Sequence, residues 1–78
     1  MALRFYIDPE TSESHIHKHD VTEQEVEEIL RRPGEDRPGQ EGTRVASGRT
    51  SNGRYLRVIY ALDVEYSSVF VITSYELR

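Results

Sequence analysis

The chain has no cysteine and no tryptophan, and it has only one methionine and three prolines among its 78 residues. Without cysteine it can form neither disulfides nor a thiolate metal site, and it has no thiol nucleophile. Small extracellular domains usually depend on disulfides, so their absence indicates the cytoplasm. No apolar run approaches the roughly 18 residues that a membrane-spanning helix needs, and the first ten residues lack the apolar segment of a signal peptide. We therefore expect a cytoplasmic protein with no membrane association.

The length allows one domain, spanning residues 1–78. A chain this short buries only about 60% of the surface that its unfolded form exposes, so its core is marginal. Hydrophobic residues make up 36% of the chain and charged residues 31%, which is lean but still typical of a globular domain. We expect such a core to be helped by homodimerisation or by tight binding to another protein.

The charges are segregated along the chain, although the net charge is only −4. Residues 8–36 carry ten acidic side chains against three basic ones, whereas residues 43–62 carry four arginines and no acid. One interpretation is a solvated acidic helix face with arginines that keep a sheet soluble. The other is a basic surface that binds phosphates.

Two helices are predicted after an N-terminal strand at Leu3–Ile7. The polar segment from Glu10 to about His19 has no β-branched run, which favours a short helix. A second helix is predicted over residues 23–32, because apolar residues recur there at helical spacing. Thr22 and Glu25 have the spacing of a capping box, in which hydroxyl and carboxylate each bind a free backbone amide.

The second half predicts an antiparallel meander. Residues 33–42 are rich in proline and glycine and predict a loop. Strands are expected at 43–50, 54–62 and 68–75, each with β-branched or alternating apolar residues. The fold class is therefore α+β: an N-terminal strand, two helices packed on one sheet face, and a three-stranded antiparallel meander.

The turn between the first two meander strands sets which side chains share a face. Asn52-Gly53 is typical of a two-residue hairpin loop. With that loop, Arg44, Tyr55 and Arg57 share one face of the sheet, and Arg49 belongs to the opposite, apolar face. A slip of one residue would reverse this assignment.

The three histidines, His15, His17 and His19, are the first candidates for a metal site. On a helix His15 and His19 lie one turn apart and can share a metal, but the sequence fixes no third ligand. A packed or exposed histidine and a general acid–base role are the alternatives. We expect no metal site and no cofactor.

Arginines and tyrosines alternate along the meander, and this pattern carries the candidate chemistry. Guanidinium groups bind phosphate in a bidentate manner, and tyrosine rings stack on bases. Arginine also stabilises the charge that builds up in a phosphoryl transition state. The pattern fits RNA binding or metal-free RNA cleavage, although strands also alternate these residues for packing and solubility. The residues concerned are Arg44, Arg49, Arg54, Arg57, Tyr55, Tyr60 and Tyr75.

Several short motifs follow in an order that resembles a known family. They are Asp8-Pro9 after a strand, residues 18–22 before an acidic helix, Gly48-Arg49-Thr50, Gly53-Arg54, and the strand segment Val58-Ile59-Tyr60. In this order and spacing they resemble the BrnT family of type II toxins, over nearly the whole chain. The resemblance implies a RelE-like α+β fold, metal-independent ribonuclease activity and a ribbon-helix-helix antitoxin as partner.

The resemblance touches Lys18, His19, Arg49 and Arg54, and it gives the arginine and tyrosine pattern a role. Together, the pattern and the resemblance predict His19, Arg49, Arg54 and Tyr75 as the catalytic residues. The RNA-binding residues are Lys18, Arg44, Tyr55 and Arg57.

Three features depart from the family pattern. Asp20 stands where the family has glycine, Tyr75 stands where it has arginine, and the chain stops at Arg78 before the basic helix that follows in the family. Three functions therefore stay open. They are a ribonuclease toxin with full, weakened or lost activity, a non-catalytic protein-interaction module of the same fold, and a metal or small-ligand binder that uses His15, His17 and His19.

Overall fold

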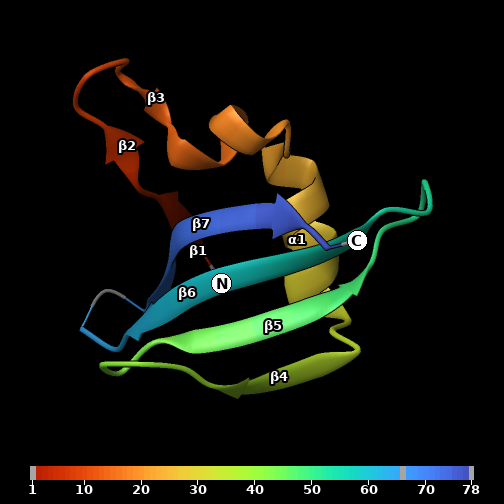
Figure 1. The fold of residues 1–78 in the computed structure, drawn as a ribbon. Helices are drawn as coiled ribbons and strands as arrows, with labels where there is room; N and C mark the ends of the chain where they lie inside the picture. The colour runs from red at the N-terminus through yellow and green to blue at the C-terminus, as the bar shows by residue number, and fades with distance from the viewer. Residues whose placement is uncertain (1, 66, 78) are drawn as a thin grey trace.

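The computed structural model describes residues 2–65 and 67–77, apart from the side chain of Lys18. Within these residues the chain forms a five-stranded sheet, one α-helix and a small two-stranded hairpin. Figure 1 shows the helix behind the sheet and the hairpin projecting from one corner. The elements are β1 (Ala2–Phe5), β2 (Ile7–Asp8), β3 (Glu13–Ser14), the 3₁₀ helix η1 (His15–His19), α1 (Glu23–Arg31), β4 (Glu35–Pro38), β5 (Arg44–Arg49), β6 (Tyr55–Asp63) and β7 (Ser68–Glu76). Within the described residues, no helix combines the length and apolarity needed to cross a bilayer.

The sheet is mixed, with strand order β1-β7-β6-β5-β4. β1 runs parallel to β7, and the other neighbouring strands are antiparallel. β2 and β3 form a separate two-stranded hairpin. α1 packs against β5 and β6 on one face, and η1 packs against β7. We call the face that carries α1 the helix face and the opposite one the open face.

Helix α1 confirms the prediction for residues 23–32. The Thr22 hydroxyl accepts a hydrogen bond from the Glu25 amide at 3.1 Å, and the Glu25 carboxylate accepts one from the Thr22 amide at 3.0 Å. This capping box satisfies amides that the first helical turn leaves free. Val26 and Ile29 are fully buried, so the apolar side of the helix faces the sheet.

The prediction of a helix from Glu10 to about His19 is wrong. The chain instead turns back at Pro9, because the Asp8 carboxylate accepts from the Glu10 amide at 2.9 Å and the Asp8 carbonyl accepts from the Ser12 amide at 2.8 Å. Ser12 has a positive φ of 60° and closes the turn. Only the last five residues become helical, as the 3₁₀ turn η1. Local side-chain bonds to the backbone thus outcompete helix formation.

The prediction of a three-stranded sheet is wrong as well, although its three strands are confirmed within one residue at each end. β1 joins the sheet as a parallel edge strand through β7. β4 lies inside the segment predicted to be a loop and pairs with β5 at the other edge. All four residues of β4 are exposed, so this strand lacks the apolar alternation that would have revealed it.

The register of the β5–β6 hairpin differs by one residue from the prediction. The Gly53 amide donates to the Thr50 carbonyl at 3.0 Å, and Gly53 has a positive φ of 89° whereas Asn52 does not. The connection is therefore longer than a two-residue Asn-Gly loop, with glycine at the position that needs positive φ. Arg49 pairs with Tyr55 and Arg44 pairs with Tyr60.

This shift exchanges two arginines between the faces, because paired residues in an antiparallel ladder point to the same side. Arg49 lies on the open face beside Tyr55, where the predicted register had placed Arg44. Arg44 lies on the helix face beside Tyr60.

The core lies between the helix face and the elements that cover it. Alternate residues of the three central strands meet the buried sides of η1 and α1. Gly48 allows a close approach here, because a Cβ at this position would lie 3.2 Å from the Gly34 amide nitrogen. The buried apolar residues are Ile16, Val21, Val26, Ile29, Ala46, Leu56, Val58, Tyr60, Val69 and Val71.

Candidate functional site

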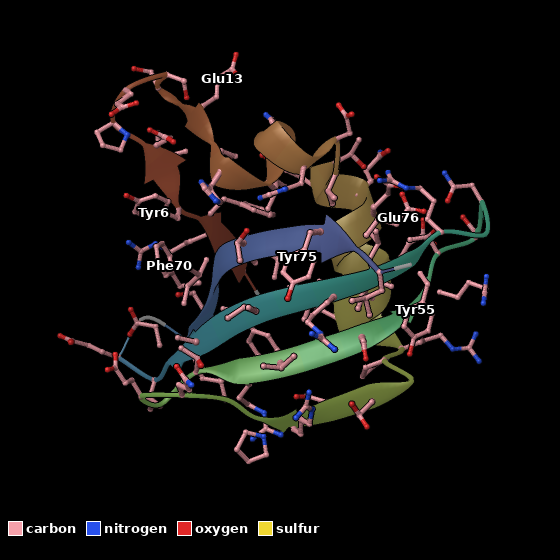
Figure 2. All side chains as sticks on the ribbon, in the orientation of Figure 1. Tyr6, Glu13, Tyr55, Phe70, Tyr75 and Glu76 are labelled. Atoms are coloured by element: carbon pink, nitrogen blue, oxygen red, sulfur yellow. The ribbon has the colours of Figure 1, made fainter. Side chains whose placement is uncertain are left out.

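The open face carries a group of aromatic and basic side chains at the end of the sheet near η1 and the β5–β6 turn. In Figure 2, Tyr55 and Tyr75 project from the face turned toward the viewer, with α1 behind the sheet. Register places Tyr75 opposite Arg57, and Tyr55 opposite Arg49. His19 joins them from η1. We call these five residues, His19, Arg49, Tyr55, Arg57 and Tyr75, the open-face cluster.

Arg57 and Tyr75 form the centre of this cluster. An η nitrogen of Arg57 lies 3.4 Å from the Tyr75 hydroxyl oxygen. The Nε atom of Arg57 is buried, and it has no hydrogen-bond partner among the described residues. Within the described part of the chain, no carboxylate lies within ion-pair distance of this guanidinium. No carboxylate of the described residues therefore neutralises the Arg57 guanidinium.

His19 lies beside Tyr75, with ring centroids 6.1 Å apart. It is exposed, whereas Tyr75 is half-buried in the sheet. η1 places it there because β1 pairs only with the first half of β7, as far as Val71, and η1 packs along β7 beyond it. An exposed imidazole and a phenol side by side can accept or donate protons at one bound group.

Arg49 and Tyr55 extend the cluster toward the hairpin turn. The Arg49 guanidinium carbon lies 5.7 Å from the centre of the Tyr55 ring, within cation–π distance. One of its η nitrogens donates to the Gly53 carbonyl at 3.0 Å. Both side chains are exposed, so the pair offers a flat ring and a charge to solvent.

Arg54 lies apart from the cluster and is held by carboxylates. One η nitrogen contacts both Glu25 oxygens, at 2.9 and 3.0 Å, and the Asp20 carbonyl at 2.8 Å. The other lies 3.4 Å from Glu76. Burial alone would raise the pKa of the Glu25 carboxyl, but the Thr22 amide and the Arg54 guanidinium outweigh burial and hold that pKa below its usual value. Arg54 thus ties the hairpin turn to the start of α1.

Arg44 also lies apart, on the helix face. Its Nε donates to the Asp36 carboxylate at 3.0 Å, and Asp36 also accepts a hydrogen bond from the Tyr60 hydroxyl at 2.6 Å. Burial and the bond to Asp36 raise the pKa of Tyr60. This arrangement fastens the edge strand β4 to β5 and β6.

The histidine run divides between different environments. His15 and His19 have ring centroids 5.5 Å apart, whereas His17 is exposed. No group of three histidine, cysteine or acidic residues in the described part of the chain is arranged to hold a metal ion. The side chain of Lys18, predicted to contact RNA, lies outside the described residues.

Sequence reasoning missed Asp8 and His15 as neighbours of the cluster. Asp8 is only 7% exposed, and its Oδ2 lies 3.9 Å from Nδ1 of His15. The Asp8-Pro9 pair and the histidine spacing were visible in the sequence, but the hairpin that brings them together was not.

A groove lies on the other side of the molecule, between α1 and the β1 side of the helix face. It has a volume of about 570 Å³. Leu62 is 56% exposed in it, so the apolar floor is only partly covered. The floor consists of Leu3, Phe5, Leu30, Tyr60, Leu62 and Val69, and Glu23, Gln24, Glu27 and Arg31 of α1 form one rim.

Comparison with known proteins identifies no relative: no family model matches the chain, and no curated protein or solved structure matches it either. The geometry of the open-face cluster is therefore the basis for a functional assignment.

Proposed function

We propose that this protein is a metal-independent endoribonuclease of the toxin type, which acts on single-stranded RNA at its open face in the cytoplasm. The observation that carries the proposal is the arrangement around Tyr75. Its hydroxyl lies 3.4 Å from Arg57, and its ring lies beside His19. The order of motifs in the chain, which resembles the BrnT family, supports the same function.

Metal-free RNA cleavage needs a positive charge at the phosphate, a proton acceptor and a proton donor, and these side chains can supply all three. The 2′-hydroxyl attacks the adjacent phosphorus, and the 5′-oxygen of the next nucleotide leaves, which gives a 2′,3′-cyclic phosphate. Arg57 neutralises the charge that grows on the phosphoryl oxygens. His19 and Tyr75 take the proton from the 2′-hydroxyl and supply one to the leaving oxygen.

Arg49 and Tyr55 bind the neighbouring nucleotide in this proposal. A base stacks on the exposed Tyr55 ring, and Arg49 contacts a phosphate. Arg44 and Arg54 take no part, because each is engaged by carboxylates within the fold. The site therefore uses five of the eight residues that the sequence indicated.

The assay is cleavage of a single-stranded RNA oligonucleotide in the presence of EDTA. The wild-type protein is expected to cleave it, and Arg57→Ala is expected to lower kcat/KM by about 10²-fold or more, since it removes the charge that faces the phosphate. Arg32→Ala is the matched control: it removes the same charge from an exposed position at the end of α1 and is expected to cleave as the wild type does. If kcat/KM falls equally in Arg57→Ala and Arg32→Ala, or if the wild type leaves the RNA intact, the proposal is contradicted.

The groove favours a second candidate, a protein-interaction module. Its partly exposed apolar floor suits contact with a partner protein, and the excess of acidic residues over the whole chain is unusual for a nucleic-acid-binding domain. The BrnT resemblance proposes a ribbon-helix-helix antitoxin as that partner. A purely interacting protein leaves RNA intact, so the same assay separates the two candidates.

A further inference from the structure

Four rings form a series of pairwise contacts from the β2–β3 hairpin to the open-face cluster. The centroids of Tyr6 and His15 lie 6.1 Å apart, those of His15 and His19 lie 5.5 Å apart, and those of His19 and Tyr75 lie 6.1 Å apart. The first two contacts are edge-to-face, a favoured geometry for aromatic pairs. The His19 ring thus contacts both His15 and Tyr75.

Backbone hydrogen bonds link His15 to β7. The His15 amide donates to the Tyr6 carbonyl at 2.9 Å, and the Tyr6 amide donates to Val71 of β7 at 2.8 Å. His15 is therefore linked through two hydrogen bonds to the strand that carries Tyr75. His19 ends η1 and is exposed, and its ring contacts those of His15 and Tyr75.

The Asp8 carboxylate lies near the His15 ring. This buried carboxylate has one oxygen engaged by the Glu10 amide, and the other lies 3.9 Å from Nδ1 of His15. That Nδ1 atom is buried and has no hydrogen-bond partner within the described residues. The distance is too long for a hydrogen bond, but it places a buried carboxylate next to an imidazole nitrogen that has no other partner among the described residues.

We infer that His15, oriented by Asp8, is a positioning residue that holds the His19 ring against Tyr75. This inference rests on the proposed function for its catalytic consequence, but the ring arrangement itself does not depend on RNA. A displacement of about 1 Å at a reacting group can cost about 10²-fold in rate. Loss of His15 therefore lowers kcat without a matching change in KM, because the groups that bind the nucleotide remain.

Three variants test this. His15→Ala is expected to lower kcat by about 10- to 100-fold with KM within about twofold, and His15→Phe, which keeps a ring but no Nδ1, is expected to fall between it and the wild type. Asp8→Asn keeps an oxygen for the Glu10 amide but loses the charge, and it is expected to resemble His15→Phe. His17→Ala, an exposed position of the same 3₁₀ helix, is the control and is expected to behave as the wild type.

A second measurement follows the geometry without RNA. Nuclear Overhauser effects between the rings of His19 and Tyr75 are expected in the wild type and in His17→Ala, and they are expected to vanish in His15→Ala while the rest of the amide spectrum stays folded. Retention of these effects in His15→Ala overturns the inference, whether or not the protein cleaves RNA. If the wild type leaves RNA intact, the proposed function fails and this second measurement alone decides the role of His15.

Discussion

Arg54 and Arg57 stand three residues apart in the chain, but their guanidinium groups have different neighbours. Arg54 lies between Glu25 and Glu76, so these two carboxylates neutralise its charge within the fold. Arg57 has a tyrosine hydroxyl beside it and a buried Nε atom that lacks a partner among the described residues. At the residue scale, the position of the carboxylates decides which arginine is free to bind a phosphate.

The hydroxyl of Tyr75 gives a test at the same scale. Tyr75→Phe removes only the oxygen near Arg57, so the fold and the RNA affinity are expected to stay within about twofold of the wild type. The cleavage rate is expected to fall by about 10²-fold, the lower end of what an acid–base group contributes. Tyr55→Phe is the control, because it keeps the stacking ring. A single-turnover rate for Tyr75→Phe equal to that of Tyr55→Phe removes Tyr75 from the chemistry.

The sequence predicted which residues gather in the cluster better than it predicted the sheet face on which each of them lies. His19, Tyr55, Arg57 and Tyr75 do come together, but the hairpin register exchanged Arg44 and Arg49. The reason is physical: the side chains of a strand alternate with period two. One extra residue in the turn therefore moves every side chain of β5 to the opposite face relative to β6. The conformation of Asn52 decides the loop length, and nothing in the dipeptide fixes it.

At the element scale, the fold depends on how α1 is held at its start. Glu25 closes the capping box and also binds Arg54 from the hairpin turn, and Arg54 reaches Glu76 at the end of β7. One side chain thus joins a helix terminus to two strands. The side chains of Glu25 and Arg54 are only 9% and 24% exposed, so this pair is screened far less than a surface pair.

Acid is expected to weaken this connection. Because folding lowers the pKa of Glu25 from its usual 4.5, the pair contributes fully above that unfolded value, and its contribution is lost as the pH falls through the lower folded value. Arg54→Met is expected to lower the free energy of unfolding by about 1.5–3 kcal/mol at pH 6. The difference from the wild type is expected to shrink toward pH 3, as measured by urea denaturation.

Arg31→Met is the matched control for that experiment. Arg31 pairs with Glu27 at 2.6 Å, but its side chain is 74% exposed. Exposed pairs of this kind contribute about 0.3–0.5 kcal/mol. If the difference in the free energy of unfolding between Arg54→Met and the wild type stays constant from pH 6 to pH 3, the account of Glu25 is contradicted.

Elements with a strong local sequence signal were predicted, and the strands β2, β3 and β4, which have no such signal, were not. α1 has a capping box and a helical apolar period, and both are visible in the sequence. β4 consists of exposed polar residues that become a strand only because β5 offers a free edge. The β2–β3 hairpin likewise depends on bonds that Asp8 makes to the turn.

At the scale of the whole molecule, the two faces of the sheet have different characters. The helix face is covered by α1, which carries four glutamates and one arginine, and the groove lies beside it. The open face carries Arg49, Arg57 and the two exposed or half-buried tyrosines of the cluster. Only part of the charge segregation along the chain persists in space, because Arg44 and Arg54 pair with carboxylates, whereas Arg49 and Arg57 give the open face its positive charge.

The most direct test of the central claim is to map where RNA binds. A short single-stranded RNA with a 2′-methoxy block at each sugar cannot be cleaved, and it can be titrated into isotope-labelled protein while amide and side-chain shifts are followed. The account expects shifts at His19, Arg49, Tyr55, Arg57 and Tyr75, which weaken as salt is raised because phosphate contacts release counterions. Shifts confined to the groove around Leu30 and Leu62, or no shifts at low salt, would contradict it.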